Sequence, residues 1–265
     1  MELPVAIIGF GEAASTFARG GDWRERACAF DIDPSRTSAM RDLGIRAAST
    51  AGEAVRSASL VISLVTADQA LAAARQSAAS LAPGALWCDM NSVAPDTKCA
   101  AAEAVQAGGA RYIDVAVLAP VSGTGLHVPL LLAGPDAASA EAALRALGFD
   151  NISRCGAEIG RASAVKMIRS VMIKGVEALT DEMMQAAQQA GVAAEVLASL
   201  DATERPFPWT VRAAYNCERM EKHGLRRAAE MEESAKTLQS LGVEPTMTRG
   251  TIQRQRDAAR RKAAQ

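Results

Sequence analysis

The sequence predicts an α/β fold: a mostly parallel sheet, followed by an all-helical region that begins with one long helix. Up to about residue 157, short apolar runs alternate with alanine-rich amphipathic stretches, the pattern of strands joined by helical crossovers. Between residues 159 and 190 there is no proline, and apolar residues recur at helical spacing. We therefore expect two domains in this chain of 265 residues, at 1–157 and 158–265.

Seven short runs in the first region are predicted strands, and most of them have the apolar character of strands that are buried on both faces of a sheet. They span residues 5–8, 27–30, 60–64, 85–88, 112–117, 130–133 and 151–154. The run that ends at residue 133 follows the preceding run after only a short loop, so we expect it to be antiparallel. Amphipathic helices are expected between the strands, at residues 68–79, 94–107 and 137–147.

The second region is predicted to be helical throughout. Its first helix is expected to run from residue 159 to residue 190, a length of about 30 residues. Further helices are expected near residues 193–200, 209–220, 224–241 and 246–263. The clearest break lies at residues 201–209, where Pro206 and Pro208 interrupt any helix.

A glycine-rich turn follows the first predicted strand. Residues 9–14 read Gly-Phe-Gly-Glu-Ala-Ala, which fits the G-x-G-x-x-G/A pattern at the start of a helix. Gly9 permits a tight turn, Gly11 lets a pyrophosphate approach the backbone, and Ala14 lets the helix pack closely on the strand. This pattern favours a Rossmann-type dinucleotide site over an ordinary glycine turn of another α/β protein. The residues expected to contact the dinucleotide are Gly9, Phe10, Gly11, Glu12 and Ala13.

An acidic residue ends the second predicted strand at the distance expected for ribose binding. Asp31 lies 22 residues after Gly9, and an acid there hydrogen-bonds the free 2′-hydroxyl of NAD and repels the 2′-phosphate of NADP. NAD is therefore favoured as the cofactor, and Arg36 keeps NADP as the alternative. The loop after the third predicted strand is expected to pass beneath the nicotinamide ribose, with Val65 and Thr66 as contacts.

A lysine in the long predicted helix is the candidate for proton transfer. The chain has six lysines against 23 arginines, and Lys166, Ser170 and Lys174 lie on roughly one side of that helix because they are four residues apart. A lysine that is partly desolvated beside a nicotinamide ring has its pKa lowered toward neutrality. It then accepts a proton from a hydroxyl group or returns one to a carbonyl oxygen. The alternative is a lysine that only extends to the surface.

Four segments carry motif-like patterns in order along the chain, at residues 9–11, 89–95, 114–123 and 160–170. The second reads Asp-Met-Asn-Ser-Val-Ala-Pro and the fourth places Lys166 four residues before Ser170. Together they resemble the β-hydroxyacid dehydrogenase and 6-phosphogluconate dehydrogenase superfamily. Residues 226–233 and 241–245 resemble a poorly characterised branch of that superfamily, which has its own helical C-terminal domain.

The resemblance implies roles for individual residues. It makes Lys166 the proton-transfer residue, with Ser170 beside it, and it places Asn91 at the cofactor. The residues that it implies at the substrate are Ser92, Ser122, Gly123 and Lys174.

Three positions depart from the superfamily pattern. Ser170 replaces an asparagine, Ala162 replaces a glycine, and Leu118 stands where the substrate loop has a serine. The Ser122-Gly123 pair follows four residues late, which indicates an insertion or a differently shaped loop. The usual specificity for a small hydroxy acid therefore does not carry over.

The resemblance implies an NAD(P)-dependent dehydrogenase or reductase that acts on CH–OH groups of a hydroxy-acid-like or related alcohol or carbonyl substrate. Oxidative decarboxylation is a variant of this activity. The alternatives are an imine reductase of the same fold and a non-catalytic NAD(P)-binding sensor or scaffold.

Composition narrows the partners. The formal net charge is −1, so no electrostatic attraction toward nucleic acid or an anionic membrane surface is expected. No apolar run approaches a membrane span, and no signal segment is apparent. Five scattered cysteines indicate reduced thiols in the cytoplasm, and two histidines without clustered ligands indicate no metal site. The apolar stripe of the long helix predicts a homodimer through the helical domain.

Overall fold

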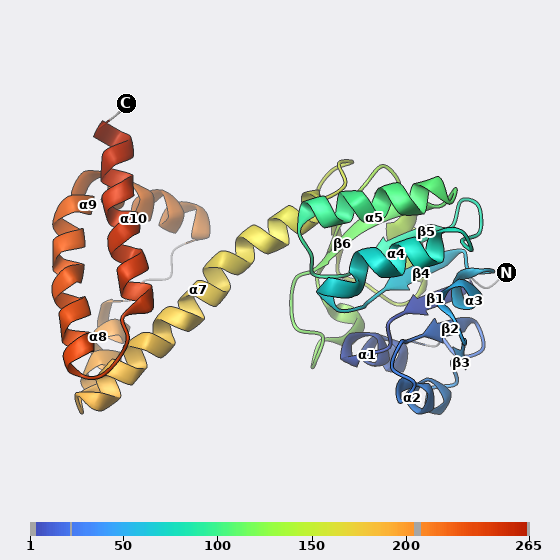
Figure 1. The fold of residues 1–265 in the computed structure, drawn as a ribbon, viewed down its shortest axis with the longest axis horizontal. Helices are drawn as coiled ribbons and strands as arrows, with labels where there is room; N and C mark the ends of the chain where they lie inside the picture. The colour runs from blue at the N-terminus through green and yellow to red at the C-terminus, as the bar shows by residue number, and fades with distance from the viewer. Residues whose placement is uncertain (1–3, 22, 204–207, 264–265) are drawn as a thin grey trace. The chain divides into compact units, whose positions relative to one another are not determined.

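A mixed sheet of eight strands forms the centre of residues 1–169 in the computed structural model, which describes residues 4–21, 23–203 and 208–263 (Figure 1). The strand order is β3-β2-β1-β4-β5-β6-β7-β8. The strands are β1 Val5–Ile8, β2 Ala27–Phe30, β3 Arg46–Ala47, β4 Leu60–Ser63, β5 Leu86–Asp89, β6 Arg111–Val117, β7 Leu130–Ala133 and β8 Ile152–Arg154. The order reverses between β1 and β4, which is where open α/β sheets bind ligands at the carboxyl ends of their strands.

The sheet confirms the predicted α/β class and the direction of its strands. All pairings are parallel except that of β6 with β7, which is antiparallel as predicted, and β8 then pairs parallel with β7. The seven predicted strands are present to within one residue at each end. The prediction lacks β3, whose two residues, Arg46 and Ala47, are too few to form a periodic pattern.

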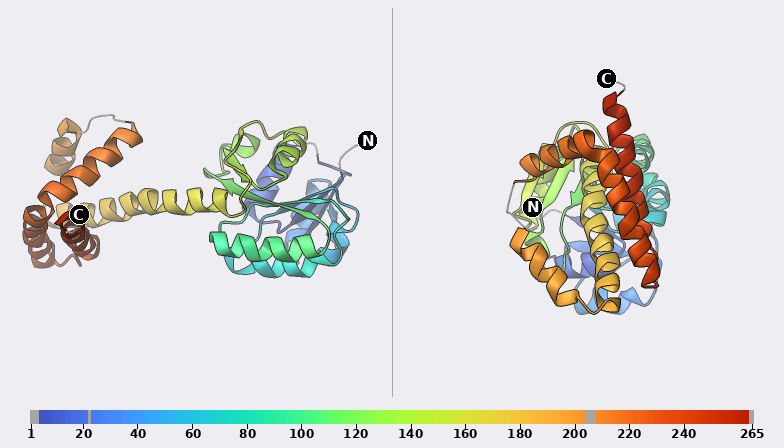
Figure 2. Two further views of the ribbon diagram at one scale, coloured as in Figure 1. Left: turned by 90° about the horizontal axis from the view of Figure 1, so that it is seen from above. Right: turned by 90° about the vertical axis from the view of Figure 1, so that its left-hand side faces the viewer.

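Helices cover both faces of the sheet and enclose two separate cores (Figure 2). One core lies under α1 Glu12–Gly20, α2 Arg36–Asp42 and α6 Ala137–Ala146, and the rings of Phe17 and Phe149 meet edge to face there at 5.0 Å. The other core lies under α3 Ala51–Val55, α4 Ala70–Ala78 and α5 Pro95–Ala107. Burial on both faces explains why the inner strands, such as β1 and β4, are continuously apolar.

The chain divides into two compact units, Met1–Arg169 and Ser170–Gln265. The division falls within α7 Arg161–Gln189, a helix of 29 residues, which confirms the long predicted helix. The domain boundary predicted after residue 157 stays a prediction. In the second unit, α8 Ala193–Thr203, α9 Trp209–Ser240 and α10 Thr246–Ala263 follow. Residues 204–207, in the predicted break, lie outside the described part of the chain.

One helix prediction in the second unit is wrong. Residues 209–220 and 224–241 are not separate helices, because α9 runs without a break from Trp209 to Ser240. Gly224, the first residue of the second predicted helix, has a packing role: a Cβ at this position would lie 2.3 Å from the carbonyl oxygen of Gln255 on α10. The glycine therefore lets α9 and α10 lie closely side by side (Figure 2).

A buried carboxylate fixes the beginning of α10. Glu182 on α7 accepts hydrogen bonds from the Met247 amide at 2.6 Å, the Thr248 amide at 2.9 Å and the Thr248 hydroxyl at 2.6 Å. Burial alone would raise the pKa of Glu182, but these hydrogen bonds outweigh it and the pKa is lowered. An acid at a helix N-terminus also interacts favourably with the helix dipole.

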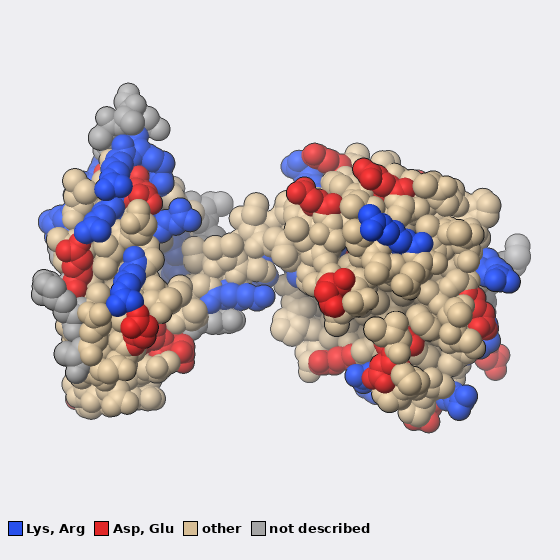
Figure 3. All heavy atoms as spheres, viewed as in Figure 1, with Lys and Arg blue, Asp and Glu red and all other residues tan. Residues whose placement is uncertain are grey.

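The surface mixes both signs of charge. Figure 3 shows acidic and basic side chains interspersed on each unit, with basic side chains more frequent along the C-terminal helices, many of them arginines in the sequence. Several of these arginines are paired with acids: Arg249 with Glu244, Arg256 with Glu232, and Arg260 with Asp257 at 3.8 Å. Within the described residues, no helix is long and apolar enough to cross a membrane.

Candidate cofactor and catalytic site

The glycine turn has the conformation that its sequence predicts. Gly9 follows β1 with a φ of +88°, and a Cβ there would lie 2.3 Å from the carbonyl oxygen of Leu64. Only glycine allows the turn to pass so close to the loop after β4. Gly11 differs, because no protein atom lies within 4 Å of the position of its missing Cβ. The turn is thus tight against the protein at Gly9 and open at Gly11.

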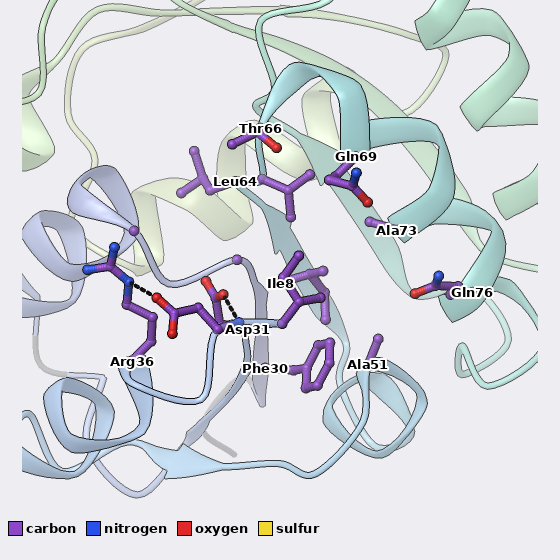
Figure 4. Close-up of a pocket in the computed structure, with 15 residues that line it drawn as sticks. Ile8, Phe30, Asp31, Arg36, Ala51, Leu64, Thr66, Gln69, Ala73 and Gln76 are labelled. Atoms are coloured by element: carbon purple, nitrogen blue, oxygen red, sulfur yellow. Dashed lines mark hydrogen bonds and ion pairs between the residues drawn. The ribbon is translucent and has the colours of Figure 1, made fainter.

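Asp31 is held at the end of β2 by two backbone amides. Its Oδ2 accepts a hydrogen bond from the Phe10 N–H at 2.6 Å, and its Oδ1 accepts one from the Asp33 N–H at 2.8 Å. The carboxylate therefore faces the glycine turn. Arg36, which would have to bind a 2′-phosphate, has its Nε 3.4 Å from Asp33 Oδ2 (Figure 4).

A cavity of about 290 Å³ opens beside this turn, at the carboxyl ends of β1, β2 and β4. Its walls are partly apolar, from Ile8, Phe30, Ala51 and Ala73, and Asp31 and Arg36 stand at its rim (Figure 4). The glycines of the turn also line it, as do Val65 and Thr66 of the loop after β4. An apolar slot next to a carboxylate suits the adenosine part of a dinucleotide.

A second cavity, of about 280 Å³, is lined by residues at the carboxyl ends of β4, β5 and β6 and by residues of α1 and α7. Its lining comprises Ala13, Leu64, Val65, Ala67, Met90, Asn91, Ser92, Val117, Ala119, Val121 and Lys166. Leu64 and Val65 line both cavities. Two cavities that adjoin along one loop, with the open side of Gly11 next to the first, fit an elongated ligand of two parts such as a dinucleotide.

Lys166 and Ser92 meet in this second cavity, although 74 residues separate them. The Lys166 Nζ, on the second turn of α7, donates a hydrogen bond to the Ser92 Oγ, on the loop after β5. The apolar residues Met90, Val117 and Val121 line the same cavity. The helix and the loop thus bring together two residues that sequence motifs alone had connected.

Asn91 lines the second cavity, but the protein itself uses its polar atoms. The side chain is largely buried, its Oδ1 accepts the Val65 N–H at 2.7 Å, and its Nδ2 donates to the Ser63 hydroxyl at 3.0 Å. Asn91 therefore fixes the loop that separates the two cavities. The side chain of Phe10 is likewise buried in the core, so this residue contributes its backbone to the turn.

The remaining predicted residues are not among those that line the two cavities. Ser122 and Gly123 are exposed on the loop after β6 and line neither cavity, whereas their neighbours Ala119 and Val121 line the second. Glu12 is exposed on the first turn of α1. Ser170 and Lys174 belong to the second compact unit, on the continuation of α7.

Sequence reasoning missed a buried ionic cluster below the site. Lys98 on α5 is 1% exposed, and its Nζ donates to the Asp89 carbonyl at 2.6 Å and to Asp89 Oδ1 at 2.8 Å. The Tyr112 hydroxyl donates to Asp89 Oδ2 at 2.7 Å, and burial together with this carboxylate raises the pKa of Tyr112. A lone lysine in an alanine-rich helix was the available signal.

The strand order, the glycine turn at the switch point and the acid that ends β2 define a protein with an NAD(P)-binding Rossmann-type domain. Residues 5–157 match the family described as the NAD binding domain of 6-phosphogluconate dehydrogenase, and the chain belongs to this family. Residues 187–258 match a second family, a domain of unknown function called DUF1932. The predicted resemblance is thereby confirmed.

Three solved structures illustrate the relationship. A conserved hypothetical protein from Sinorhizobium meliloti 1021 is 37% identical, covers 98% of this chain and 89% of its own, and has a TM-score of 0.65. The conserved protein MTH1747, described as structurally similar to 3-hydroxyacid dehydrogenases, is 30% identical over 97% of this chain and 98% of its own, with a TM-score of 0.62. An imine reductase from Myxococcus stipitatus in complex with NADP+ shares the fold, with a TM-score of 0.78 and 18% identity over 97% of this chain and 94% of its own.

Proposed function

We propose that this chain is an NAD(P)-dependent dehydrogenase or reductase that interconverts a hydroxyl and a carbonyl group, with Lys166 as general acid and base. The observation that supports this most directly is the Lys166–Ser92 contact. It lies in a cavity that adjoins the proposed adenosine cavity along Leu64 and Val65. Lys166, the proposed proton-transfer group, thus lies where we expect the nicotinamide end of a bound dinucleotide.

The chain's own residues have separate tasks in this reaction. When bound, the nicotinamide accepts or supplies the hydride. The neutral amine of Lys166 accepts the hydroxyl proton during oxidation, and its ammonium form donates that proton to the carbonyl oxygen during reduction. The Ser92 Oγ accepts a hydrogen bond from Lys166 and leaves its own O–H to orient the substrate oxygen. The apolar side chains of Met90, Val117 and Val121 limit the access of water.

NAD is the proposed cofactor, with NADP as the alternative. The Asp31 carboxylate is fixed at the end of β2 by two amide hydrogen bonds, so it cannot easily turn away from a 2′-phosphate. Arg36 stands 3.4 Å from Asp33, and that carboxylate competes with a phosphate for the guanidinium group. Both features favour a ribose with a free 2′-hydroxyl.

The substrate contacts beyond Ser92 are proposals as well. Ser122 and Gly123 on the loop after β6, and Ser170 and Lys174 on α7, are proposed to position a polar or acidic group of the substrate. This loop is tied to α7, because the Arg169 guanidinium donates to the Leu118 carbonyl at 3.2 Å. It therefore starts beside the helix that carries Lys166.

A second copy of the chain is proposed to cover α7. The side chains of Val171, Met172, Ile173, Val176 and Leu179 are each between 40% and 74% exposed, and they point to several sides of the helix. An exposed apolar face of this breadth on a helix is stabilised when another surface buries it. A homodimer through α7 buries this face, and light scattering should give twice the chain mass of 27.7 kDa. A monomer at all concentrations would contradict the dimer.

A panel of hydroxy acids, alcohols, carbonyl compounds and imines, with NADH formation or consumption as the signal, tests the activity. We expect turnover on the hydroxyl–carbonyl pair and its loss in Lys166→Ala, with cofactor affinity unchanged within about severalfold because Lys166 acts on the substrate. Full turnover of Lys166→Ala would remove this residue from the mechanism. Activity on imines alone, or tight NADH binding without any turnover, would replace the proposal with one of the two alternatives. Release of CO₂ would identify oxidative decarboxylation.

A further inference from the structure

A single buried cation lies between the strands and the helix that carry the proposed site. The Lys98 ammonium contacts Asp89, the last residue of β5, and it lies 3.4 Å from Asp114 Oδ1 on β6. Both carboxylates are completely buried. Charges so far from water require partners, and within the described residues Lys98 is the cation paired with both acids.

Asp89 connects this cluster to the Ser92 loop. Its Oδ1 accepts the backbone N–H of Asn91 at 2.9 Å, and Asn91 in turn accepts the N–H of Val65 at 2.7 Å. Ser92 follows directly in the chain. The Asp89 carboxylate therefore fixes the start of the loop that carries the Ser92 hydroxyl. Through Asn91, the same chain of hydrogen bonds extends to Val65, on the loop that lines both cavities.

Asp114 connects the same cluster to the helix that carries Lys166. Its Oδ2 accepts the backbone N–H of Ser163 at 2.9 Å, in the first turn of α7. The Ser163 hydroxyl donates to the carbonyl of Val93, one residue after Ser92. Lys166 lies three residues further along α7, on the same side of the helix. The first turn of α7 is thus fixed against both β6 and the Ser92 loop.

We propose that Lys98 is a positioning residue for Lys166. Its ammonium holds the two carboxylates that orient the Ser92 loop and the first turn of α7, and these keep the Lys166 Nζ on the Ser92 Oγ. Lys98 itself lines neither of the two cavities. The functional meaning of this arrangement rests on the proposed role of Lys166, but the positioning itself is independent of any substrate.

The chemistry of the cluster explains why a cation is needed there. Without Lys98, Asp89 and Asp114 would remain as two buried acids without a paired cation. One of them would then take up a proton or turn toward another donor, because two uncompensated charges are not stable in the interior. Either change disturbs a carboxylate that accepts a backbone amide, that of Asn91 in the case of Asp89 and that of Ser163 in the case of Asp114. Loss of either hydrogen bond then disturbs the Lys166–Ser92 contact.

Trace acetylation of the full-length protein with acetic anhydride tests this positioning without cofactor or substrate. Peptide mass spectrometry measures the labelling of Lys166 relative to that of Lys222, an exposed lysine on α9. In Lys98→Met we expect the relative labelling of Lys166 to rise about threefold to tenfold, as expected when one hydrogen bond of an amine is lost. Asp114→Ala, which removes the acceptor of the Ser163 amide and one of the two carboxylates paired with Lys98, should raise the labelling in the same direction. It decides the question alone if Lys98→Met does not fold.

Val105→Ala is the matched control, because Val105 is a buried residue two turns further along α5 and makes a cavity without removing a charge. An equal rise of Lys166 labelling in Val105→Ala would mean that Lys98 only stabilises the fold, and would overturn the proposal. Unchanged labelling in the cluster variants would also overturn it. Failure of the proposed function is separate, since it would appear as absent NADH binding or turnover in the wild-type protein.

Discussion

Replacing each of the two glycines of the turn by alanine should separate stability from cofactor binding. At Gly9, φ is +88°, and the new Cβ would lie 2.3 Å from the Leu64 oxygen and 2.9 Å from Val65 Cγ1. The left-handed conformation costs about 1–2 kcal/mol for a residue with a Cβ, and the clash with the backbone adds about 1–3 kcal/mol. Gly9→Ala should therefore destabilise the first unit by roughly 2–5 kcal/mol.

Gly11→Ala should have the opposite profile. Gly11 has a φ of −76°, which alanine adopts without strain, and no protein atom lies within 4 Å of the new Cβ. The change of helix-cap residue costs at most about 1 kcal/mol. The methyl group instead occupies the space through which a pyrophosphate would approach the backbone, so NADH binding should be lost.

Thermal unfolding and titration with NADH measure the two effects side by side. For a domain of this size each 1 kcal/mol lowers the melting temperature by about 2–4 °C, so the change in Gly9→Ala is well resolved. If Gly9→Ala had the melting temperature of the wild type, the packing argument would be refuted. Wild-type NADH affinity of Gly11→Ala would refute the placement of the pyrophosphate.

Two further substitutions test charges in the two units. Asp31→Asn keeps an acceptor for the Phe10 amide and removes the negative charge. The ratio of the NADPH affinity to the NADH affinity, measured by fluorescence titration, should therefore rise about fivefold to tenfold, the equivalent of ~1 kcal/mol of repulsion. An unchanged ratio would exclude Asp31 as the residue that selects between the two cofactors. Glu182→Gln should lower the melting temperature near pH 7, because the folded state favours the Glu182 carboxylate and lowers its pKa below 4.5. A lowered pKa stabilises the fold above the unfolded pKa, and this contribution is lost as the pH falls through the folded pKa, so the difference between wild type and Glu182→Gln should narrow on acidification. If the difference in melting temperature between wild type and Glu182→Gln stayed constant from pH 7 down through the folded pKa of Glu182, the role of the charge would be contradicted.

The sequence was sufficient for the fold wherever one local pattern dominates. Most of the strands, such as β1, β2 and β4, are predicted by apolar runs because both faces of the sheet are buried there, and the turn at Gly9 is predicted because only glycine tolerates its geometry. The pattern fails at β3, where two residues are too few, and at Gly224, where a contact with α10 rather than a helix end requires the glycine.

The candidate site could be predicted only in part, since its residues meet through tertiary contacts. Motif order indicated Ser92 and Lys166, and their hydrogen bond follows from the packing of α7 on the loop after β5. No local pattern indicates that Lys98, Asp89 and Asp114 form one buried cluster, because they come from a helix and two strands. The cofactor contact predicted for Asn91 stays a prediction, and no local pattern indicates that its side chain also hydrogen-bonds Val65 and Ser63 within the protein.

We propose that the two cavities beside Leu64 and Val65 hold one dinucleotide, with Lys166 at its far end. The sharpest test of this claim is titration of the purified protein with NADH and NADPH, followed by energy transfer from its tryptophans. We predict binding of NADH in the micromolar range and much weaker binding of NADPH, because Asp31 repels the 2′-phosphate. Preference for NADPH would keep the dinucleotide site and assign the ribose to Arg36. Absence of binding to either nucleotide would contradict the claim.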